Sequence, residues 1–425
     1  MNARKPLVAT LGGLVLAVAL AGCEGDDGRD GVDGAPGTDG APGADGAPGT
    51  DAKAALSLKL LGRTAPLGGF DESAAEIVAY HPATVRAFVV NAEAGNVDII
   101  DLQDPAAPVR VDTLDVAADV EAAEGLAAGS MGSVNSVDIS GDTVAVALAA
   151  DVSQENGYIV FYTTDGTYLS AAQAGALPDK VGFSPDGRYA VAANEGEPND
   201  DYSVDPEGSL TIVDVSAGFD SPVAVTADFK AFNAGGSKEL SGPVRIAAKA
   251  GSVAQDLEPE FVAFSADSST VFATLQENNA VAIADLASAE VTAVLGIGFK
   301  DYGLPGNELD ASNRDGGANI RSWSVFGTYM PDGFDSYDVA GTTYLVTANE
   351  GDGREYVTDA ADEADCASQG GFLFDDGDCF HYLDELRIKD LDPSQLTDAL
   401  KAKLGADFQE EGKLGRLKII TDLGL

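Results

Sequence analysis

Carboxylate and amide side chains gather in two classes of loop, where their types and spacing could bind a cation. One class follows the second strand of a repeated unit, and the other leads into a first strand. The candidate metal ligands are Glu195, Glu197, Glu258, Glu260, Glu277, Asp310, Asp315, Asn349, Glu350 and Asp352. Ca²⁺ and Mg²⁺ take carboxylate, amide and water oxygens. The residue types therefore predict a divalent-cation site, with Ca²⁺ favoured over Mg²⁺.

Two of these candidates, Asp310 and Asp315, lie in a stretch that resembles a calcium-binding loop. Residues 307–317 alternate acidic and other side chains before two glycines, at Gly316 and Gly317. The order departs from that of an EF-hand, so the stretch alone is a weak indication of calcium binding.

Histidine and cysteine are too scarce for several other kinds of site. The chain has two histidines, His81 and His381, which argues against a Ser-His-Asp triad and against a histidine-rich transition-metal site. Cys366 and Cys379 flank an insertion rich in glycine and aspartate. In an exported protein such a pair predicts a disulfide, with two free thiols or a zinc pair as the alternatives.

The overall charge excludes one class of function. Lys and Arg number 25 against 70 Asp and Glu, which gives a formal net charge of -45. A phosphate backbone would be repelled, so the protein is not expected to bind nucleic acid. Solubility, adaptation to salty surroundings and cation binding each remain as reasons for this charge.

A repeated hairpin positions the acidic residues. In its clearest copy, a strand at 181–183 leads through a tight turn at 184–187 to a second strand at 189–193, which runs into Glu195. Further copies are expected at 262–275 and 337–350, weaker copies begin at Ile77 and Val134, and third strands are expected at 97–101, 158–162, 210–214 and 281–285. Such repeated antiparallel units predict an all-β fold, a β-propeller, with a β-sandwich as the competitor.

The propeller interpretation turns sequence position into a spatial prediction. In a blade of four antiparallel strands, loops after the second and fourth strands emerge on the same face. The candidate ligands should therefore gather on one face, and the tight turns such as 184–187 should lie on the other.

The amino terminus predicts export and a lipid anchor. Arg4 and Lys5 precede an apolar run that ends in Leu20-Ala21-Gly22-Cys23. This resembles a bacterial lipobox, which implies a signal peptide at 1–22 and acylation of Cys23, with an ordinary secretory signal as the alternative. The chain would then be attached to the cell envelope, at the outer membrane or cell surface, through its lipid.

A spacer follows the lipidation site. Within residues 23–54 glycine falls at every third position from Gly25 to Gly49, as in collagen. Its many aspartates would repel one another across three chains, which favours an extended acidic spacer, with a homotrimeric stalk as the alternative. The third expected domain is the propeller, at 55–425.

Three stretches, 257–286, 299–323 and 347–356, resemble the choice-of-anchor I domain. This β-propeller family is related to the mesenchyme-specific cell-surface glycoproteins and to some atypical bacterial alkaline phosphatases. The resemblance covers about residues 56–425 and implies a propeller whose relatives differ in how they are fixed to the surface. Members usually continue further, so the resemblance predicts a propeller that is incomplete at its carboxyl-terminal end.

Two functions from different classes follow. The first is a non-catalytic surface module whose acidic face binds divalent cations. The second is a metal-dependent phosphomonoesterase, in which carboxylate-bound metal would activate water and Arg321 or Arg354 would bind phosphate oxygens. For each arginine, a salt bridge to a neighbouring carboxylate is the alternative role. The binding module is preferred because no nucleophile or base stands out.

Overall fold

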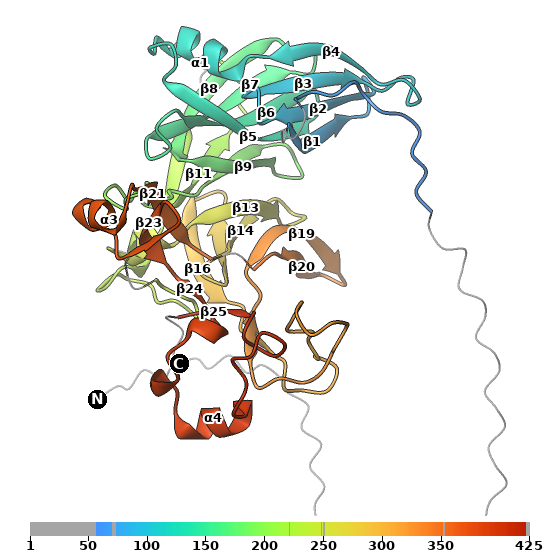
Figure 1. Cartoon of the computed structure of the whole chain (residues 1–425). Coiled ribbons are helices and arrows are strands. Elements are labelled where there is room, and N and C mark those ends of the chain that lie inside the picture. The colour runs from blue at the N-terminus through green and yellow to red at the C-terminus, as the bar shows by residue number, and fades with distance from the viewer. Residues whose placement is uncertain are drawn as a thin grey trace, which may run out of the picture. The chain divides into compact units, whose positions relative to one another are not determined.

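The computed structural model describes residues 57–69, 74–220, 222–247, 249, 251–351 and 353–421. The predicted signal peptide, the lipidation site Cys23, the spacer and the candidate ligand Asp352 lie outside the described residues. The chain divides into two units, Met1–Lys59 and Leu60–Leu425. The helices and strands of the described chain, shown in Figure 1, all lie in the second unit.

Four four-stranded antiparallel sheets follow one another along the described chain, each with its strands in sequence order. The first sheet is β1 (Ala75–His81), β2 (Arg86–Asn91), β3 (Asn96–Asp101) and β4 (Val109–Leu114); the second is β5 (Met131–Ser140), β6 (Thr143–Ala150), β7 (Asn156–Thr163) and β8 (Tyr168–Ala176). The third is β9 (Pro178–Phe183), β10 (Tyr189–Asn194), β11 (Ser209–Asp214) and β12 (Ala224–Asp228); the fourth is β13 (Pro259–Phe264), β14 (Thr270–Leu275), β15 (Ala280–Asp285) and β16 (Glu290–Gly296). The expected first, second and third strands are present in these sheets, except for the copy at 337–350, which falls in a two-stranded sheet of Pro331–Val339 and Thr342–Asn349.

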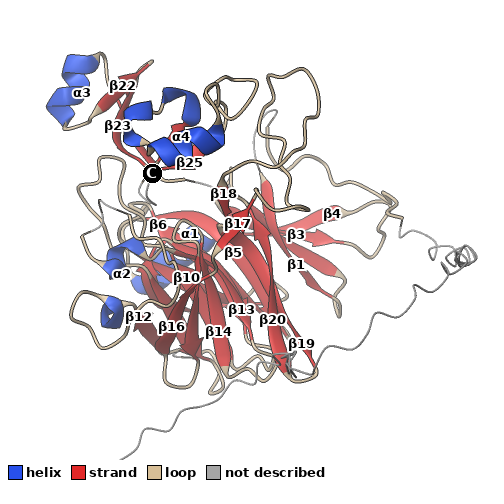
Figure 2. Cartoon of the chain, turned by 90° about the horizontal axis from the view of Figure 1, so that it is seen from below, coloured by secondary structure: helices blue, strands red, loops and turns tan. Residues whose placement is uncertain are grey.

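The first strands of successive sheets adjoin one another, as in a propeller. β1 contacts β5, β5 contacts β9, β9 contacts β13, and β13 contacts β19 (Pro331–Val339) of a following two-stranded sheet with β20 (Thr342–Asn349). Figure 2 shows β13, β14, β19 and β20 running alongside one another, with loops at both ends of the strands. Consecutive four-stranded meanders that meet through their first strands define an all-β β-propeller.

Apolar side chains between neighbouring sheets form three layers of core. One layer, which includes Phe88 and Val160, lies between the first and second sheets. Another, around Phe161 and Val181, lies between the second and third sheets. A further layer between the third and fourth sheets contains Leu210 and Leu275. Both faces of the inner sheets are thus covered, which explains why β6 and β10 are almost continuously apolar.

The tight turn predicted at 184–187 is present between β9 and β10. Ser184 donates from Oγ to Asp186 at 2.7 Å, and Gly187 has a φ of 70°. The equivalent turn in the fourth sheet repeats the contact, since Ser265 Oγ donates to Asp267 at 2.7 Å. Each of these turns joins the first two strands of its sheet. The turns therefore lie at one end of the strands, and Glu195 and Glu277 lie at the other.

Shorter elements complete the described chain. The strands are β17 (Phe299–Asp301), β18 (Phe326–Thr328), β21 (Glu355–Asp359), β22 (Leu373–Asp375), β23 (Asp378–Leu383), β24 (Glu385–Arg387) and β25 (Lys418–Ile420); the helices are α1 (Val116–Glu124), α2 (Val253–Asp256), α3 (Glu363–Gln369) and α4 (Asp398–Leu404), with 3₁₀ turns at Lys230–Phe232, Ile388–Asp390 and Pro393–Gln395. The expected disulfide between Cys366 and Cys379 is present and links α3 to β23. A small separate core around Trp323, Ile388 and Leu414 holds the carboxyl-terminal segments together.

Close backbone contact at Gly208 fixes the loop that carries Glu195 against the start of β13. A Cβ atom at Gly208 would lie 1.9 Å from the carbonyl oxygen of Leu257, whereas one at Gly317 would have nothing within 4 Å. We expect Gly208→Ala to lower the free energy of unfolding by about 1–3 kcal/mol through steric strain. Gly317→Ala is the matched control, expected to change it by less than about 0.5 kcal/mol. Equal urea midpoints for the two variants would contradict this packing.

Candidate functional site

Three strand junctions bring acidic side chains together at one end of the third and fourth sheets. Glu195 and Glu197 follow β10, Glu277 follows β14, and Glu258 and Glu260 stand at the start of β13. Asp179, in β9, joins them. We call these six residues the acidic cluster: Asp179, Glu195, Glu197, Glu258, Glu260 and Glu277. The expected gathering of Glu195, Glu197, Glu258, Glu260 and Glu277 therefore occurs.

Burial and mutual repulsion raise the pKa values within the acidic cluster. Desolvation is the main cause at Glu260, where Glu277 and Glu195 add repulsion and the pKa reaches about 11. The same two causes, with Glu197 as the largest charged contributor, raise the pKa of Glu195 well above its usual value. For Glu197 the pKa is raised to about 6 by burial and by Glu277, although Tyr356 donates a hydrogen bond to it. Burial raises the pKa of Asp179 to about 6.

Gln276 supplies a polar contact inside the acidic cluster. Its side-chain amide, turned with the nitrogen toward Glu260, donates to the two carboxylate oxygens at 2.9 and 2.7 Å. In the opposite orientation the amide oxygen faces Glu260, and the nitrogen lies 3.4 Å from Glu350 Oε2.

Arg354 is a buried cation beside the acidic cluster. Its Nε and Nη2 lie 2.8 and 2.7 Å from Glu258 Oε2, and Nη2 donates to the carbonyl of Asp256 at 2.8 Å. Nη1 lies 3.3 Å from Asp256 Oδ1. All three side chains are almost fully buried. The salt-bridge role considered for Arg354 is therefore the one that its geometry favours.

Arg245 forms a second buried ion pair nearby. It contacts Asp384 Oδ2 through Nη2 and donates from Nη1 to the carbonyl of Glu277 at 3.1 Å. Asn278 connects the two pairs, because its amide nitrogen donates at 2.8 Å to Asp256 Oδ2 and at 3.0 Å to the carbonyl of Arg245. The result is one buried polar network that joins the β12–β13 loop to the segment after β20.

The remaining predicted ligands lie in different settings. Asn349 and Glu350 are exposed at the end of β20, where Asn349 accepts a hydrogen bond from Thr347 at 2.9 Å. Asp310 lines a separate cavity and accepts from the backbone of Asn319 at 3.2 Å. Asp315 lies beside Gly412. Neither aspartate is among the groups that perturb the pKa values of the acidic cluster.

Arg321, the other predicted phosphate ligand, packs on an aromatic ring. Its guanidinium carbon lies 3.6 Å from the centre of the Trp323 ring. Its backbone pairs with Leu309 in an isolated antiparallel bridge. Stacking of this kind is a stabilising cation–π contact.

Asp179 was not among the predicted ligands, although it belongs to a repeated sequence pattern at the start of the first strands. The first strands begin Pro178-Asp179, Pro259-Glu260 and Pro331-Asp332, and the register shifts at this point in each of the three sheets. β1 has Glu76 at the same place, again at a register shift. Reading the first strands as an aligned repeat, rather than reading only the loops, would have found these carboxylates.

Among the described residues, no group of three His, Cys, Asp or Glu side chains is already arranged to hold a metal ion. The donor set consists of carboxylates and amides, which fits the chemistry of Ca²⁺ or Mg²⁺. Within the same part of the chain, no helix is both long enough and apolar enough to cross a membrane.

The sheet topology and the buried carboxylates define a β-propeller with an acidic cluster at one end of its strands. The family model of the choice-of-anchor I domain matches residues 76–424, and the chain belongs to this family. The resemblance noted in the sequence is thereby confirmed. The protein is accordingly a surface-associated β-propeller module.

Comparison with solved structures gives distant similarities. Hydrazine synthase of Kuenenia stuttgartiensis is 14% identical over 50% of this chain and 64% of that chain, with a TM-score of 0.26. The β-propeller domain of Cps50 (Swd1) from Myceliophteria thermophila is 13% identical over 55% and 58%, with a TM-score of 0.33. A protein from Lactobacillus plantarum is 14% identical over 61% and 59%, with a TM-score of 0.33. The chain thus spans less than two thirds of each of them, and no curated protein matches it.

Removing Arg354 should leave buried carboxylates without their cation. We expect Arg354→Gln to lower the free energy of unfolding by about 3–5 kcal/mol, because breaking a buried pair strands a charge. Arg188 is the control, since it pairs with Asp214 at 2.8 Å but both side chains are about half exposed. Arg188→Gln should cost less than about 1 kcal/mol. Similar denaturation midpoints for both variants would show that Arg354 is not the critical counter-ion.

Stability without added cation should fall as pH rises. The folded-state pKa values of Asp179 and Glu197, at about 6, exceed the ordinary values of about 3.9 and 4.3. Their stabilising contribution is complete below pH 4 and is lost as pH rises through about 6, and that of Glu260 continues to fall toward its pKa of about 11. Melting temperatures in chelator should therefore decrease from pH 5 to pH 8, less steeply in Glu197→Gln than in Glu290→Gln, an exposed-site control. A melting temperature that rises over this interval would contradict the raised pKa values.

Proposed function

We propose that the protein is a surface-anchored binding module whose acidic cluster binds a divalent cation, with Ca²⁺ preferred. The single observation behind this proposal is the excess of buried carboxylates over buried cations. Glu258, Glu260 and Glu277 of the acidic cluster are buried, as are Asp256 and Asp384 beside it, whereas the buried arginines of the described chain are Arg245 and Arg354. Asp179, Glu195 and Glu197 are partly buried. Protons or a cation must offset this excess if the carboxylates are to stay buried at neutral pH.

A cation competes with protons for the acidic cluster. At neutral pH the pKa of Glu260, at about 11, favours its protonated form, and burial also raises the pKa of Glu195. Like charges about 4 Å apart repel by about 4 kcal/mol at an effective dielectric of 20. A divalent ion relieves this repulsion and accepts the same oxygens as ligands, so binding would release protons.

Ca²⁺ is favoured over Mg²⁺ by the character of the donors. Ca²⁺ accepts six to eight oxygens in adaptable geometry, whereas Mg²⁺ requires near-ideal octahedral coordination. The carboxylates of the acidic cluster come from separate junctions, at β9, β10, β13 and β14. They would have to turn toward a common ion, which the more adaptable coordination of Ca²⁺ tolerates.

The anchor in this proposal is the lipid expected on Cys23. Lipid on Cys23 would hold the propeller at the envelope, in agreement with its surface-associated family. Mass spectrometry of the mature amino terminus tests the acylation, and an unmodified Cys23 would exclude it.

The phosphoesterase alternative receives less support from the arginines assigned to it. Arg354 contacts Glu258 and Asp256, and Arg321 stacks on Trp323. Both side chains are thus engaged within the protein instead of being presented to a substrate.

The proposal is tested by titrating Ca²⁺ into chelator-treated protein. Ca²⁺ at a hundred times its dissociation constant should stabilise the fold by about 2.7 kcal/mol. Glu260→Gln should raise the melting temperature without Ca²⁺, because glutamine is neutral in both states whereas Glu260 must take up a proton on folding at neutral pH. It should also weaken or abolish the response to Ca²⁺. Glu290→Gln is the control, since Glu290 is exposed and pairs with Lys238.

The outcomes separate the two functions. A rise in melting temperature with Ca²⁺ that Glu260→Gln removes and Glu290→Gln retains would support the binding module. An unchanged melting temperature across the titration would overturn it. Cation-dependent turnover of a phosphomonoester, lost in Glu260→Gln, would favour the phosphoesterase instead.

A further inference from the structure

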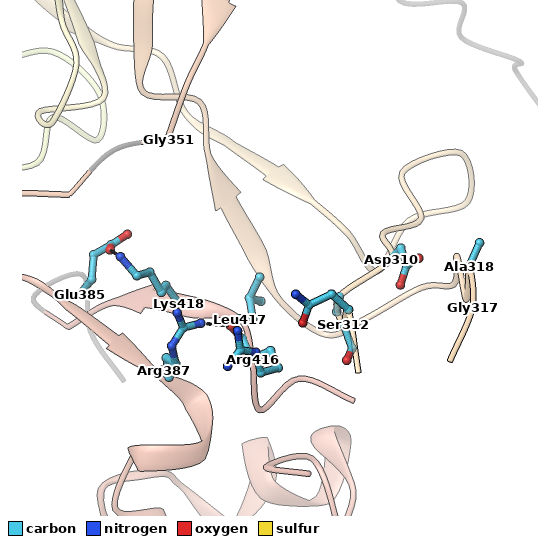
Figure 3. Close-up of a pocket in the computed structure, with 12 residues that line it drawn as sticks. Asp310, Ser312, Gly317, Ala318, Gly351, Glu385, Arg387, Arg416, Leu417 and Lys418 are labelled. Carbon is cyan, nitrogen blue, oxygen red and sulfur yellow. Dashed lines mark hydrogen bonds and ion pairs between the residues drawn. The ribbon is translucent and has the colours of Figure 1, made fainter. Parts of the chain in front are cut away.

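A cavity of about 790 Å³ lies between the β17–β18 loop and the two-stranded sheet of β24 and β25. Figure 3 shows Glu385, Arg387, Arg416 and Lys418 on one side of it, with Asp310, Ser312, Gly317 and Ala318 on the other. Three of these residues are cations, in a chain with 25 Lys and Arg against 70 Asp and Glu. The cavity is therefore lined by more cationic than anionic side chains, whereas the protein as a whole carries a large negative net charge.

The pairing of β24 with β25 sets like charges opposite each other. Arg387 is the cross-strand partner of Lys418 in the antiparallel register. Like charges directly opposite in a sheet are destabilising. Lys418 contacts Glu385, which offsets its charge. Arg387 and Arg416 form no direct ion pair among the described residues, although Glu411 interacts electrostatically with Arg416.

The two arginines are held in place but keep donors for a ligand. Arg387 donates from Nη1 to the carbonyl of Arg416 at 2.8 Å, which fixes its guanidinium beside β25. Arg416 has a buried Nε without a hydrogen-bond partner in the described part of the chain. A guanidinium carries five N–H donors, so most of the donors of both groups are available. A buried donor without a partner costs free energy unless a ligand or water satisfies it.

We propose that this cavity binds a phosphate group, with Arg387 and Arg416 as its main ligands and Lys418 at the rim. Guanidinium groups bind phosphate through paired, charge-assisted hydrogen bonds. A phosphate would satisfy the Nε of Arg416 and separate the like charges of Arg387 and Lys418. The site is distinct from the acidic cluster. Two carboxylates, Asp310 and Glu385, also line the cavity, and Glu385 is engaged by Lys418.

Calorimetric titration of the purified protein with inorganic phosphate tests this site, against sodium chloride at equal ionic strength. Phosphate should bind saturably and raise the melting temperature, whereas chloride should do neither. Arg416→Gln should weaken phosphate binding about tenfold or more, as expected for loss of a charge-assisted contact. Arg416→Lys keeps the charge but loses the planar guanidinium, so it should bind phosphate with intermediate affinity. It provides the test if Arg416→Gln does not fold.

Lys389→Gln is the matched control, because Lys389 lies in the same segment and pairs with Glu411 at 3.1 Å instead of lining the cavity. It should bind phosphate like the unmodified protein. Equal responses to phosphate and chloride, or equal losses in Arg416→Gln and Lys389→Gln, would overturn the proposal. Vesicles of phosphatidylglycerol that compete with phosphate would assign the group to a lipid headgroup, and lack of competition would assign it to a soluble phosphate.

Discussion

The burial of Arg354 between Glu258 and Asp256 is the interaction on which the acidic end of the propeller depends. A charge removed from water costs several kcal/mol unless its partners are well placed, and here the partners contact Nε, Nη1 and Nη2. Arg354 precedes β21, whereas Glu258 and Asp256 precede β13. The same contact that neutralises the glutamate therefore also holds the carboxyl-terminal segment against the fourth sheet. Arg245 and Asp384 repeat this arrangement a short way along the chain.

Carboxylate pKa values shift in opposite directions at the two ends of the same sheets. At the tight turns, Asp186 and Asp267 are exposed, and hydrogen bonds from Ser184 and Ser265 lower their pKa values. At the other end, burial raises the pKa values of Glu195 and Glu260. The causes differ, because hydrogen bonds to the ionised carboxylates dominate at the turns whereas desolvation dominates at the acidic cluster. Because ionising the carboxylates at this end is costly, a bound cation would add most to the stability of the fold there.

Positive charge is segregated as well. The acidic cluster holds its arginines inside ion pairs, whereas Arg387 and Arg416 face a cavity supported by the small core around Trp323 and Leu414. That core is separate from the layers between the sheets. The carboxyl-terminal segments can therefore present basic side chains that the acidic sheets themselves could not accommodate without forming salt bridges.

The sequence by itself determined the strands and the face to which their loops belong. Alternating apolar residues and the Ser-Pro-Asp-Gly turn located β9 and β10, and chain direction then required Glu195, Glu258 and Glu277 to share one end, because antiparallel strands alternate in direction. The outer strands were not identified, and in β4 nearly all side chains are exposed. Only the tertiary structure decided which carboxylates are buried, that Arg354 is an ion-pair partner, and that Asp310 faces Arg416 across a separate cavity. These outcomes depend on contacts between residues as much as about 100 positions apart, which local propensity and periodicity do not encode.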